Sequence, residues 1–405
     1  MITDLNDILS TNVKGMKRSA IRELLKLLGR PGLISFSGGF PAPSTFPIEE
    51  LKEITHEVLE NEGAFALQYG ATEGDTLLRT LMVNRYKAAG VDMSIDNMII
   101  TTASQQALDL IAKIFIDRGD YVIVGLPSYL GGLSAFNSYG AQMIGIPMDE
   151  EGEDPTFMEA KLKELAAMGK KPKFIYVIPD FQNPAGMTMS ERRRKEIIAL
   201  AHKYDVLIIE DSPYRELRYE GEHQKTMYEL DGSGHVVLLG TFSKIFCPGF
   251  RIGWVVGHED ILDKIVMAKQ ATDLCTPPFT QRIAARYIEK GLLDPKIAQI
   301  AQMYQSKQKV MLAALDQFMP EEFTWTKPEG GLFLMASGPK DLDTNALLLD
   351  CVKEANVAYV AGVSFFCDGS GTNTMRLNFS YETEEKNLEG CERLGNFFKK
   401  AISKS

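Results

Sequence analysis

The sequence lacks the patterns typical of membrane proteins and of proteins held together by disulfides. Its 405 residues include five cysteines, an odd and scattered set with no CxxC pair, which predicts free thiols in a reducing compartment. No apolar run approaches the roughly 18 residues that a membrane-spanning helix needs. The first residues lack the basic start and apolar stretch of a secretory signal. We therefore expect a cytoplasmic protein with no membrane partner.

Excess positive charge and nucleotide-binding signatures are also missing. The 44 Lys and Arg against 54 Asp and Glu leave a net charge of −10, which argues against a nucleic-acid partner. The chain has no GxGxxG and no Walker lysine, so nucleotide binding is not expected. Its five histidines show no metal-ligand spacing, and we expect no metal site. The chain is long enough for two domains with a sizeable core.

Between about 95 and 257, short Val/Ile/Leu-rich runs alternate with amphipathic helical segments. This pattern predicts an α/β fold in which a mostly parallel sheet is covered by helices on both faces. Seven strands are expected, at 98–101, 121–126, 143–147, 174–178, 206–209, 236–239 and 252–256. Ligands of such sheets usually bind beyond the carboxyl ends of the strands.

The rest of the chain predicts a smaller α+β unit and an N-terminal arm. Residues 259–317 read as a long helical region broken near Pro277-Pro278, and they are followed by shorter strands and a terminal helix at 383–402. A short amphipathic helix is expected in the arm, ending at Pro31-Gly32. We divide the chain into an arm at 1–48 that contacts the small domain, a large domain at 49–290 and a small domain at 291–405.

Lys244 lies just past the buried strand at 236–239, within Gly-Thr-Phe-Ser-Lys-Ile-Phe-Cys-Pro-Gly-Phe-Arg. A lysine in this position can form a Schiff base with an aldehyde cofactor, while Ser243 and Arg251 bind that cofactor's phosphate. A single lysine after a strand is more often a solvated charge. The prediction therefore depends on the residues at the ends of the other strands.

Suitable groups lie at those strand ends. Asp211 can keep a pyridine nitrogen protonated, and Asn183 and Tyr214 can both reach a phenolic oxygen. Tyr129 offers a stacking face, and the segment Ser104-Gln105-Gln106 opens a helix whose N–H groups suit an anion. Each residue has an ordinary explanation when taken alone: a helix cap at Ser104 or Asp211, a packed loop tyrosine, an Asn-Pro turn. Together they predict one pyridoxal 5'-phosphate site.

Across almost its whole length the chain resembles the fold type I, class I/II aminotransferases, with most likeness to the 2-aminoadipate/kynurenine subgroup. The resemblance implies that Lys244 is the Schiff-base lysine, that Asp211 pairs with the pyridine nitrogen and that Tyr129 stacks on the ring. It also implies that Arg376, in Met-Arg-Leu-Asn-Phe, binds the substrate α-carboxylate and that Gly39 lies beside the substrate. Tyr69 would reach the phosphate from a neighbouring subunit, which implies a homodimer with shared active sites.

The arm carries the clue to the substrate. Ser19-Ala20-Ile21-Arg22 resembles the mobile helix of the aminoadipate subgroup, where an arginine binds a side-chain carboxylate and moves aside for apolar substrates. The alternative is a solvated helix arginine. The chain departs from relatives at Ala361-Gly362, where Pro-Gly is frequent, and this affects loop stiffness more than chemistry.

These residues support three hypotheses about function. The first is an amino-acid:2-oxo-acid aminotransferase that moves an amino group from 2-aminoadipate, an aromatic or another large apolar donor to 2-oxoglutarate, in a ping-pong exchange through aldimine and ketimine. The second is a C–S β-lyase that uses the same cofactor. The third is a ligand-binding regulator, which the acidic charge and the short segment before Arg22 disfavour. The preferred donor and the number of subunits beyond two stay open.

Overall fold

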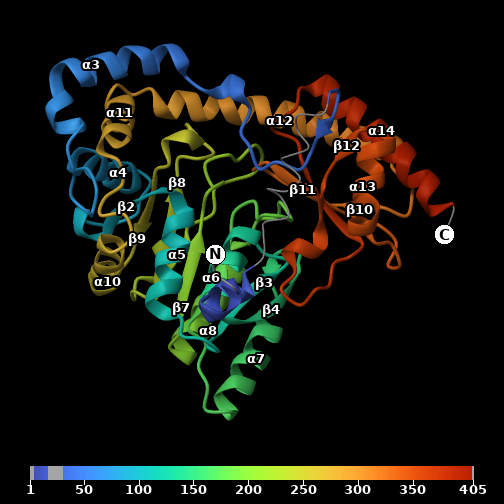
Figure 1. Cartoon of the computed structure of the whole chain (residues 1–405), viewed down its shortest axis with the longest axis horizontal. Helices are drawn as coiled ribbons and strands as arrows, with labels where there is room; N and C mark the ends of the chain where they lie inside the picture. The colour runs from blue at the N-terminus through green and yellow to red at the C-terminus, as the bar shows by residue number, and fades with distance from the viewer. Residues whose placement is uncertain (1–3, 17–30, 404–405) are drawn as a thin grey trace.

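The computed structural model describes residues 4–16 and 31–403. A large central sheet with strand order β2-β9-β8-β7-β6-β3-β4-β5 dominates the fold (Figure 1). The strands β3, β4, β6, β7 and β8 run parallel, whereas β2-β9, β8-β9 and β4-β5 are antiparallel pairs. The bounds are β2 Met98–Thr101, β3 Tyr121–Leu126, β4 Gln142–Asp149, β5 Gly152–Glu153, β6 Phe174–Val177, β7 Leu207–Asp211, β8 Val236–Thr241 and β9 Gly253–Val256.

The α/β fold with a mostly parallel sheet is confirmed, with an eighth strand where seven were expected. The additional strand is β5, only two residues long, which pairs with the end of β4 through Met148–Glu153 and Asp149–Gly152. Two residues carry too little periodicity to be recognised in a sequence. The other seven strands fall within two residues of their expected bounds.

Two sets of helices cover the two faces of this sheet. On one face α7, α8 and α9 pack on alternate strand residues such as Ile175, Ile208 and Val236. On the other face α5 and α6 pack on the intervening residues, which include Tyr176 and Ile209. The bounds are α5 Ala103–Phe115, α6 Leu130–Ser138, α7 Pro155–Ala167, α8 Glu191–Tyr204 and α9 Met227–Asp231.

The helical region after the large sheet has two breaks. α10 (Glu259–Gln270) and α11 (Pro278–Glu289) are separated at the expected proline pair, but α11 and α12 (Leu293–Phe318) are separated again around Gly291. Gly291 has φ +69°, a left-handed conformation that glycine adopts at little cost at a helix C-terminus. The helices α3 (Ile48–Ala66) and α4 (Thr76–Ala88) pack against α11 (Figure 1). None of the helices in the described part of the chain is long and apolar enough to cross a bilayer.

A smaller sheet with order β10-β11-β14-β13 lies beside the large one, at the carboxyl-terminal side of the molecule (Figure 1). All its strand pairs are antiparallel, and helices α12 and α14 pack on each other beside it. The bounds are β10 Thr324–Trp325, β11 Phe333–Ser337, β12 Val357–Ala358, β13 Val360–Ala361, β14 Thr374–Asn378, α13 Thr344–Glu354 and α14 Glu384–Ile402.

The arm contacts both parts of the molecule. Its strand β1 (Ile34–Ser35) pairs in parallel with β12, and the Phe36 carbonyl accepts a hydrogen bond from the Asn378 N–H. Further upstream, α1 (Thr11–Gly15) lies on α6, where Asn137 Nδ2 donates to the Gly15 carbonyl. The expected amphipathic helix, with Ile21, Arg22 and Leu28, lies outside the described residues. The domain boundaries at 48 and 290 stay predictions.

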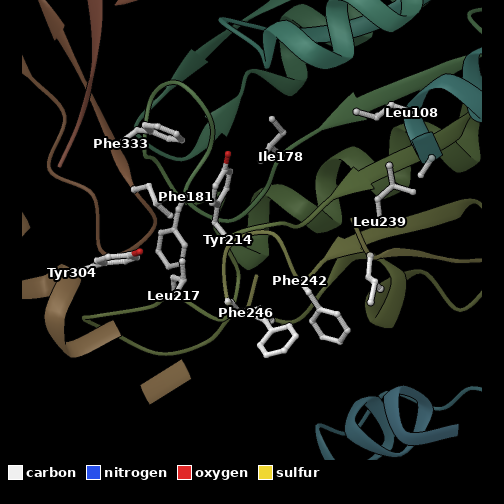
Figure 2. Packing of buried hydrophobic residues seen from close by; sticks show 14 of the residues in the cluster. Leu108, Ile178, Phe181, Tyr214, Leu217, Leu239, Phe242, Phe246, Tyr304 and Phe333 are labelled. Atoms are coloured by element: carbon white, nitrogen blue, oxygen red, sulfur yellow. The ribbon is translucent and has the colours of Figure 1, made fainter. Parts of the chain in front are cut away.

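A continuous apolar core joins the two sheets. Figure 2 shows Tyr214 from the large-sheet side and Phe333 from β11 within this core, and their rings meet edge to face at 5.8 Å. Phe181, Leu217 and Phe246 belong to the same cluster. Polar groups beside Tyr214 and Phe333 therefore lie at a junction where packing from both sheets excludes water.

Candidate active site

Strand register brings the carboxylate of Asp211 to the buried face under α6. Tyr176 pairs with Ile209 across β6 and β7, and alternation along β7 then puts Asp211 on the same face as Tyr176. Tyr176 Oη donates a 2.8 Å hydrogen bond to Asp211 Oδ2, and both side chains are buried. The other oxygen, Asp211 Oδ1, is buried without a hydrogen-bond partner among the described residues. Asp211 can therefore accept one further strong donor.

Burial is the main influence on this carboxyl group. It raises the pKa of Asp211 to about 6, although the Tyr176 hydrogen bond and the nearby charge of Lys244 act in the opposite direction. A buried carboxylate with a free lone pair is costly unless a cationic donor meets it. A protonated ring nitrogen is a donor of this kind.

Lys244 follows β8 at the carboxyl ends of the parallel strands, as expected. Its Nζ donates a 2.8 Å hydrogen bond to the carbonyl of Gly39, in the segment that leads from the arm into the large sheet. Burial, together with the charges of Arg376 and Arg251, lowers the pKa of Lys244 to about 8, against the opposing influence of Asp211. The amine is therefore closer to its neutral, nucleophilic form at physiological pH than an ordinary lysine.

Asn183, Tyr214 and Arg376 form a hydrogen-bonded chain. Asn183 Nδ2 donates to Tyr214 Oη at 3.1 Å, and Arg376 Nη1 donates to Asn183 Oδ1 at 2.9 Å. Arg376 Nη2 donates to the Ser37 carbonyl at 2.8 Å. Burial raises the pKa of Tyr214 well above its ordinary value, so this hydroxyl stays a proton donor.

The Arg376 guanidinium lies between two aromatic rings. Its central carbon is 4.1 Å from the centroid of Phe333 and 5.1 Å from that of Phe365. Burial lowers the pKa of Arg376 to about 10, and its Nε is buried with no hydrogen-bond partner in the described chain. A buried cation of this kind is suited to an incoming carboxylate.

The start of α5 has backbone N–H groups without a side-chain cap from the described chain, as an anion site would require. No side chain of the described residues caps this helix, and Ala103 adopts φ +59°, which turns the chain sharply into the first helical turn. The Ala103 N–H donates to the Arg251 carbonyl at 3.1 Å, which ties the helix start to the segment after Lys244. A Cβ on Gly253 would come within 2.6 Å of the Ser104 nitrogen, so this close approach requires glycine.

The remaining residues expected at the cofactor differ in their contacts. The Ser243 and Thr241 hydroxyl oxygens lie 2.9 Å apart, within hydrogen-bond distance. Tyr129 Oη donates a hydrogen bond to Gln105 Oε1 at 3.3 Å. Gln106 differs from the expectation, because its side chain accepts from the Thr102 N–H and donates to Asp273 instead of joining the cluster. As residue four of a helix that starts at Ala103, Gln106 has its side chain on the face that meets Asp273 after α10.

Three expected residues depend on the arm or on a second subunit. Gly39 lies in the cluster, bonded to Lys244 and close to the Phe333 ring. Tyr69 is 80% exposed in the single chain, and its expected place at the phosphate of a neighbouring subunit stays a prediction. Arg22 lies outside the described residues.

The sequence reasoning missed Tyr176, Phe333 and Phe365. Tyr176 lies in the middle of a strand, and only the pairing of β6 with β7 reveals that its hydroxyl meets Asp211. A tyrosine in an otherwise apolar buried run was the available signal, because a buried hydroxyl needs a partner.

Comparison with known proteins agrees with this geometry. The family model "Aminotransferase class I and II" matches residues 34–394. An aromatic-amino-acid aminotransferase from Thermococcus litoralis is 48% identical over 99% of this chain and 96% of its own length. The structure of Pyrococcus horikoshii kynurenine aminotransferase, in complex with PMP, superposes with a TM-score of 0.95 at 46% identity and covers 99% of both chains.

A third relative comes from Thermus thermophilus. The structure of LysN, an α-aminoadipate aminotransferase complexed with N-(5'-phosphopyridoxyl)-L-leucine, gives a TM-score of 0.92 at 35% identity, over 99% of this chain and all of that chain. The chain therefore belongs to the class I and II aminotransferases of fold type I. It is an aminotransferase, and its cofactor is pyridoxal 5'-phosphate.

The described residues fit this cofactor. The unpaired oxygen of Asp211 suits the ring N–H, and the Asn183–Tyr214 pair suits the ring hydroxyl. The uncapped start of α5 suits the phosphate, and the buried amine of Lys244 suits the aldehyde.

Proposed function

We propose that this aminotransferase takes aromatic, 2-aminoadipate or other large apolar amino acids as donors and 2-oxoglutarate as acceptor. The observation that carries the proposal is the Arg376 guanidinium, buried between Phe333 and Phe365 with a free Nε and one N–H already on Asn183. The activities for which the relatives are named, on aromatic amino acids, kynurenine and α-aminoadipate, support the same substrate class. The lyase alternative has no counterpart among these three relatives.

Each residue has a distinct task. Arg376 binds the substrate α-carboxylate and orients Cα. Lys244 Nζ would hold the cofactor covalently and, as a free amine, would move the proton from the substrate Cα to the cofactor carbon C4′. When bound, pyridoxal phosphate would supply an electron sink for the negative charge left at Cα. Asp211 keeps that sink charged, while Asn183 and Tyr214 fix the ring through its phenolic oxygen. Ser243, Arg251 and the backbone N–H groups of Ser104 and Gln105 bind the phosphate, and Tyr129 stacks on the ring.

The cleanest test is a donor panel with 2-oxoglutarate, measured by glutamate formation. We expect kcat/KM for tyrosine, kynurenine and 2-aminoadipate to exceed that for alanine, because the pocket walls at Phe333 and Phe365 are aromatic. Arg376→Lys should raise KM for every donor about tenfold or more, since a lysine cannot replace two guanidinium contacts. A pocket that favours alanine, or an Arg376→Lys variant with unchanged KM, would contradict the proposal.

Arg22 is proposed to decide between acidic and apolar donors. An arginine that binds the distal carboxylate should matter for 2-aminoadipate and not for leucine or tyrosine. Arg22→Ala should therefore lower kcat/KM for 2-aminoadipate alone. An equal loss for all three donors would assign Arg22 a structural role instead.

The functional unit is proposed to be a homodimer with Tyr69 of the partner subunit at the phosphate. The basis is an exposed cluster at the end of α3, in which Phe65, Leu67 and Tyr69 are 52%, 70% and 80% exposed. Leu67→Asp should convert the dimer to a monomer in light scattering. The matched control is Leu349→Asp on α13, where a leucine of similar exposure (57%) lies away from this cluster.

A further inference from the structure

Two histidines and an aspartate meet at the end of the large sheet at which its parallel strands begin. His202 lies in the last turn of α8, Asp231 ends α9, and His235 directly precedes β8. One ligand atom from each residue lies within 4.8 Å of the other two. Lys244 follows the other end of β8, so the length of a strand separates this cluster from the active site. The two histidines are 33 positions apart, which is why no spacing motif announced them.

The three side chains converge on one point, which the structure marks with the Ser233 hydroxyl. Ser233 Oγ is 2.9 Å from His202 Nε2, 2.6 Å from Asp231 Oδ1 and 2.8 Å from His235 Nδ1. Nitrogen and carboxylate ligands hold Zn²⁺ at about 2.0–2.2 Å. This point is already within hydrogen-bond distance of three such atoms, so the ligands would move closer to it, while His202 Nε2 and Asp231 Oδ1, which now lie 2.6 Å apart, would separate to admit the ion. Rotation of one serine torsion would leave the point to an ion.

The outer contacts of the cluster orient the same three atoms. His235 Nε2 lies 3.3 Å from Asp205 Oδ1, so the ring nitrogen away from the cluster faces a carboxylate. Asp231 Oδ2 accepts the backbone N–H of His235 at 2.8 Å and that of Ser233 at 3.2 Å, which leaves Oδ1 for the cluster. Outer partners of this type fix the tautomer and direction of metal ligands.

The aspartate side chain of the cluster is buried, whereas the two histidine side chains are partly exposed. The Asp231 side chain is only 3% exposed, while that of His202 is 40% exposed and leaves a path for an ion. The two imidazole rings lie 4.9 Å apart, inclined by 55°. Two neutral imidazoles and one carboxylate carry a single negative charge, which suits a divalent cation of intermediate softness.

We propose that His202, Asp231 and His235 bind one divalent transition-metal ion of the Zn²⁺ type, with water in the fourth position. The ion would join the ends of α8 and α9 to the start of β8. Because it binds only the folded arrangement, it should raise the unfolding temperature. It contributes no group to the active site, so transamination should not require it.

The test is a calorimetric titration of the chelator-treated holoenzyme with Zn²⁺ alone. We expect one ion per chain, and affinity weakened about tenfold or more in His202→Gln and in His235→Gln. The matched control is His56→Gln, since His56 is an exposed helix histidine beside Glu60. Ser233→Ala should bind at least as tightly as the natural protein, because the hydroxyl occupies the ion's position.

Thermal unfolding separates lost binding from lost folding. In chelator, the two glutamine variants should unfold near the temperature of the natural protein and keep their transaminase rate. Zn²⁺ should then raise the unfolding temperature of the natural protein and of His56→Gln, and leave both glutamine variants unchanged. Absence of binding to the natural protein, or binding that survives both substitutions, would overturn the proposal.

Discussion

At the scale of single residues, the site depends on two ionisable groups, Asp211 and Lys244. Burial moves the pKa values of these two groups toward each other. Asp211 is raised to about 6 and Lys244 lowered to about 8, while an ordinary aspartate and lysine titrate several units apart. The Tyr176 hydroxyl is the one side-chain donor to Asp211 among the described residues. It favours the carboxylate form, which is the form that pairs with a protonated ring nitrogen.

Tyr176→Phe should therefore disturb the cofactor's electronic state. Without this hydrogen bond the pKa of Asp211 rises further, so the carboxylate would take the proton from the ring nitrogen more readily and the ring would be less fully protonated. We expect kcat to fall about tenfold, because a hydrogen bond to a charged group contributes roughly 1.5 kcal/mol. The pH titration of the visible cofactor band should shift in parallel.

The matched control for this variant is Tyr359→Phe. Tyr359 is a buried tyrosine that donates a 2.6 Å hydrogen bond to the Thr344 carbonyl, in the small-sheet region. Its loss should cost stability and leave the cofactor band unchanged. If both variants, or neither, shift the band, Tyr176 has no specific role at Asp211.

At the scale of elements, strands and their ends were predictable because each carries its own signal. The aliphatic runs gave seven strands, and the groups just past them gave Asn183, Asp211, Tyr214 and Lys244. The contacts between elements were not predictable in this way. Tyr176 needed the β6–β7 register, and Gln106 needed the packing of α5 beside Asp273. The His202–His235 cluster likewise needed the end of α8 to be placed beside the segment that precedes β8.

The approach of β9 to α5 gives a prediction at this scale. A methyl group at position 253 would meet the Ala103 carbonyl carbon and the Ser104 nitrogen at 2.6 Å, which would displace the helix start that we propose binds the phosphate. Gly253→Ala should weaken pyridoxal phosphate binding about tenfold or more, since overpacking of this kind costs roughly 1–3 kcal/mol. Pyridoxal without phosphate should lose much less affinity.

Gly257→Ala is the control, because an added Cβ there meets its nearest neighbour, Val237 Cγ2, at an ordinary 3.6 Å. Both affinities can be measured by quenching of protein fluorescence. An equal loss for the two vitamers would place the effect of Gly253 outside the phosphate site.

At the scale of the whole molecule, the buried site makes the cofactor-free protein less stable near neutral pH. The folded pKa of Asp211 lies above its ordinary value of 3.8, so its contribution to stability is lost as pH rises from about 4 through 6. The folded pKa of Lys244 lies below 10.5, so its contribution is lost as pH falls toward 8. The two groups together destabilise the empty fold most between pH 6 and 8.

Asp211→Asn tests this account in the cofactor-free protein. At pH 7 the substitution should raise the free energy of unfolding, by at most about 3 kcal/mol for a shift of this size. At pH 4 the gain should vanish, because Asp211 is then protonated in the folded protein as well. Urea unfolding at the two pH values measures it, with the exposed Asp263→Asn as control. A gain that is the same at both values would contradict a raised pKa at Asp211.

The central claim is that Lys244 holds the cofactor covalently in this site. Borohydride reduction of the yellow enzyme, followed by peptide mass spectrometry, tests it most directly. We predict one pyridoxyl group per chain, on the peptide that contains Lys244 and not on that of Lys269, a second buried lysine, which is paired with Asp273. Lys244→Ala should carry no label and lose transamination. A label on another lysine, or a Lys244→Ala enzyme that transaminates at a near-normal rate, would contradict the account.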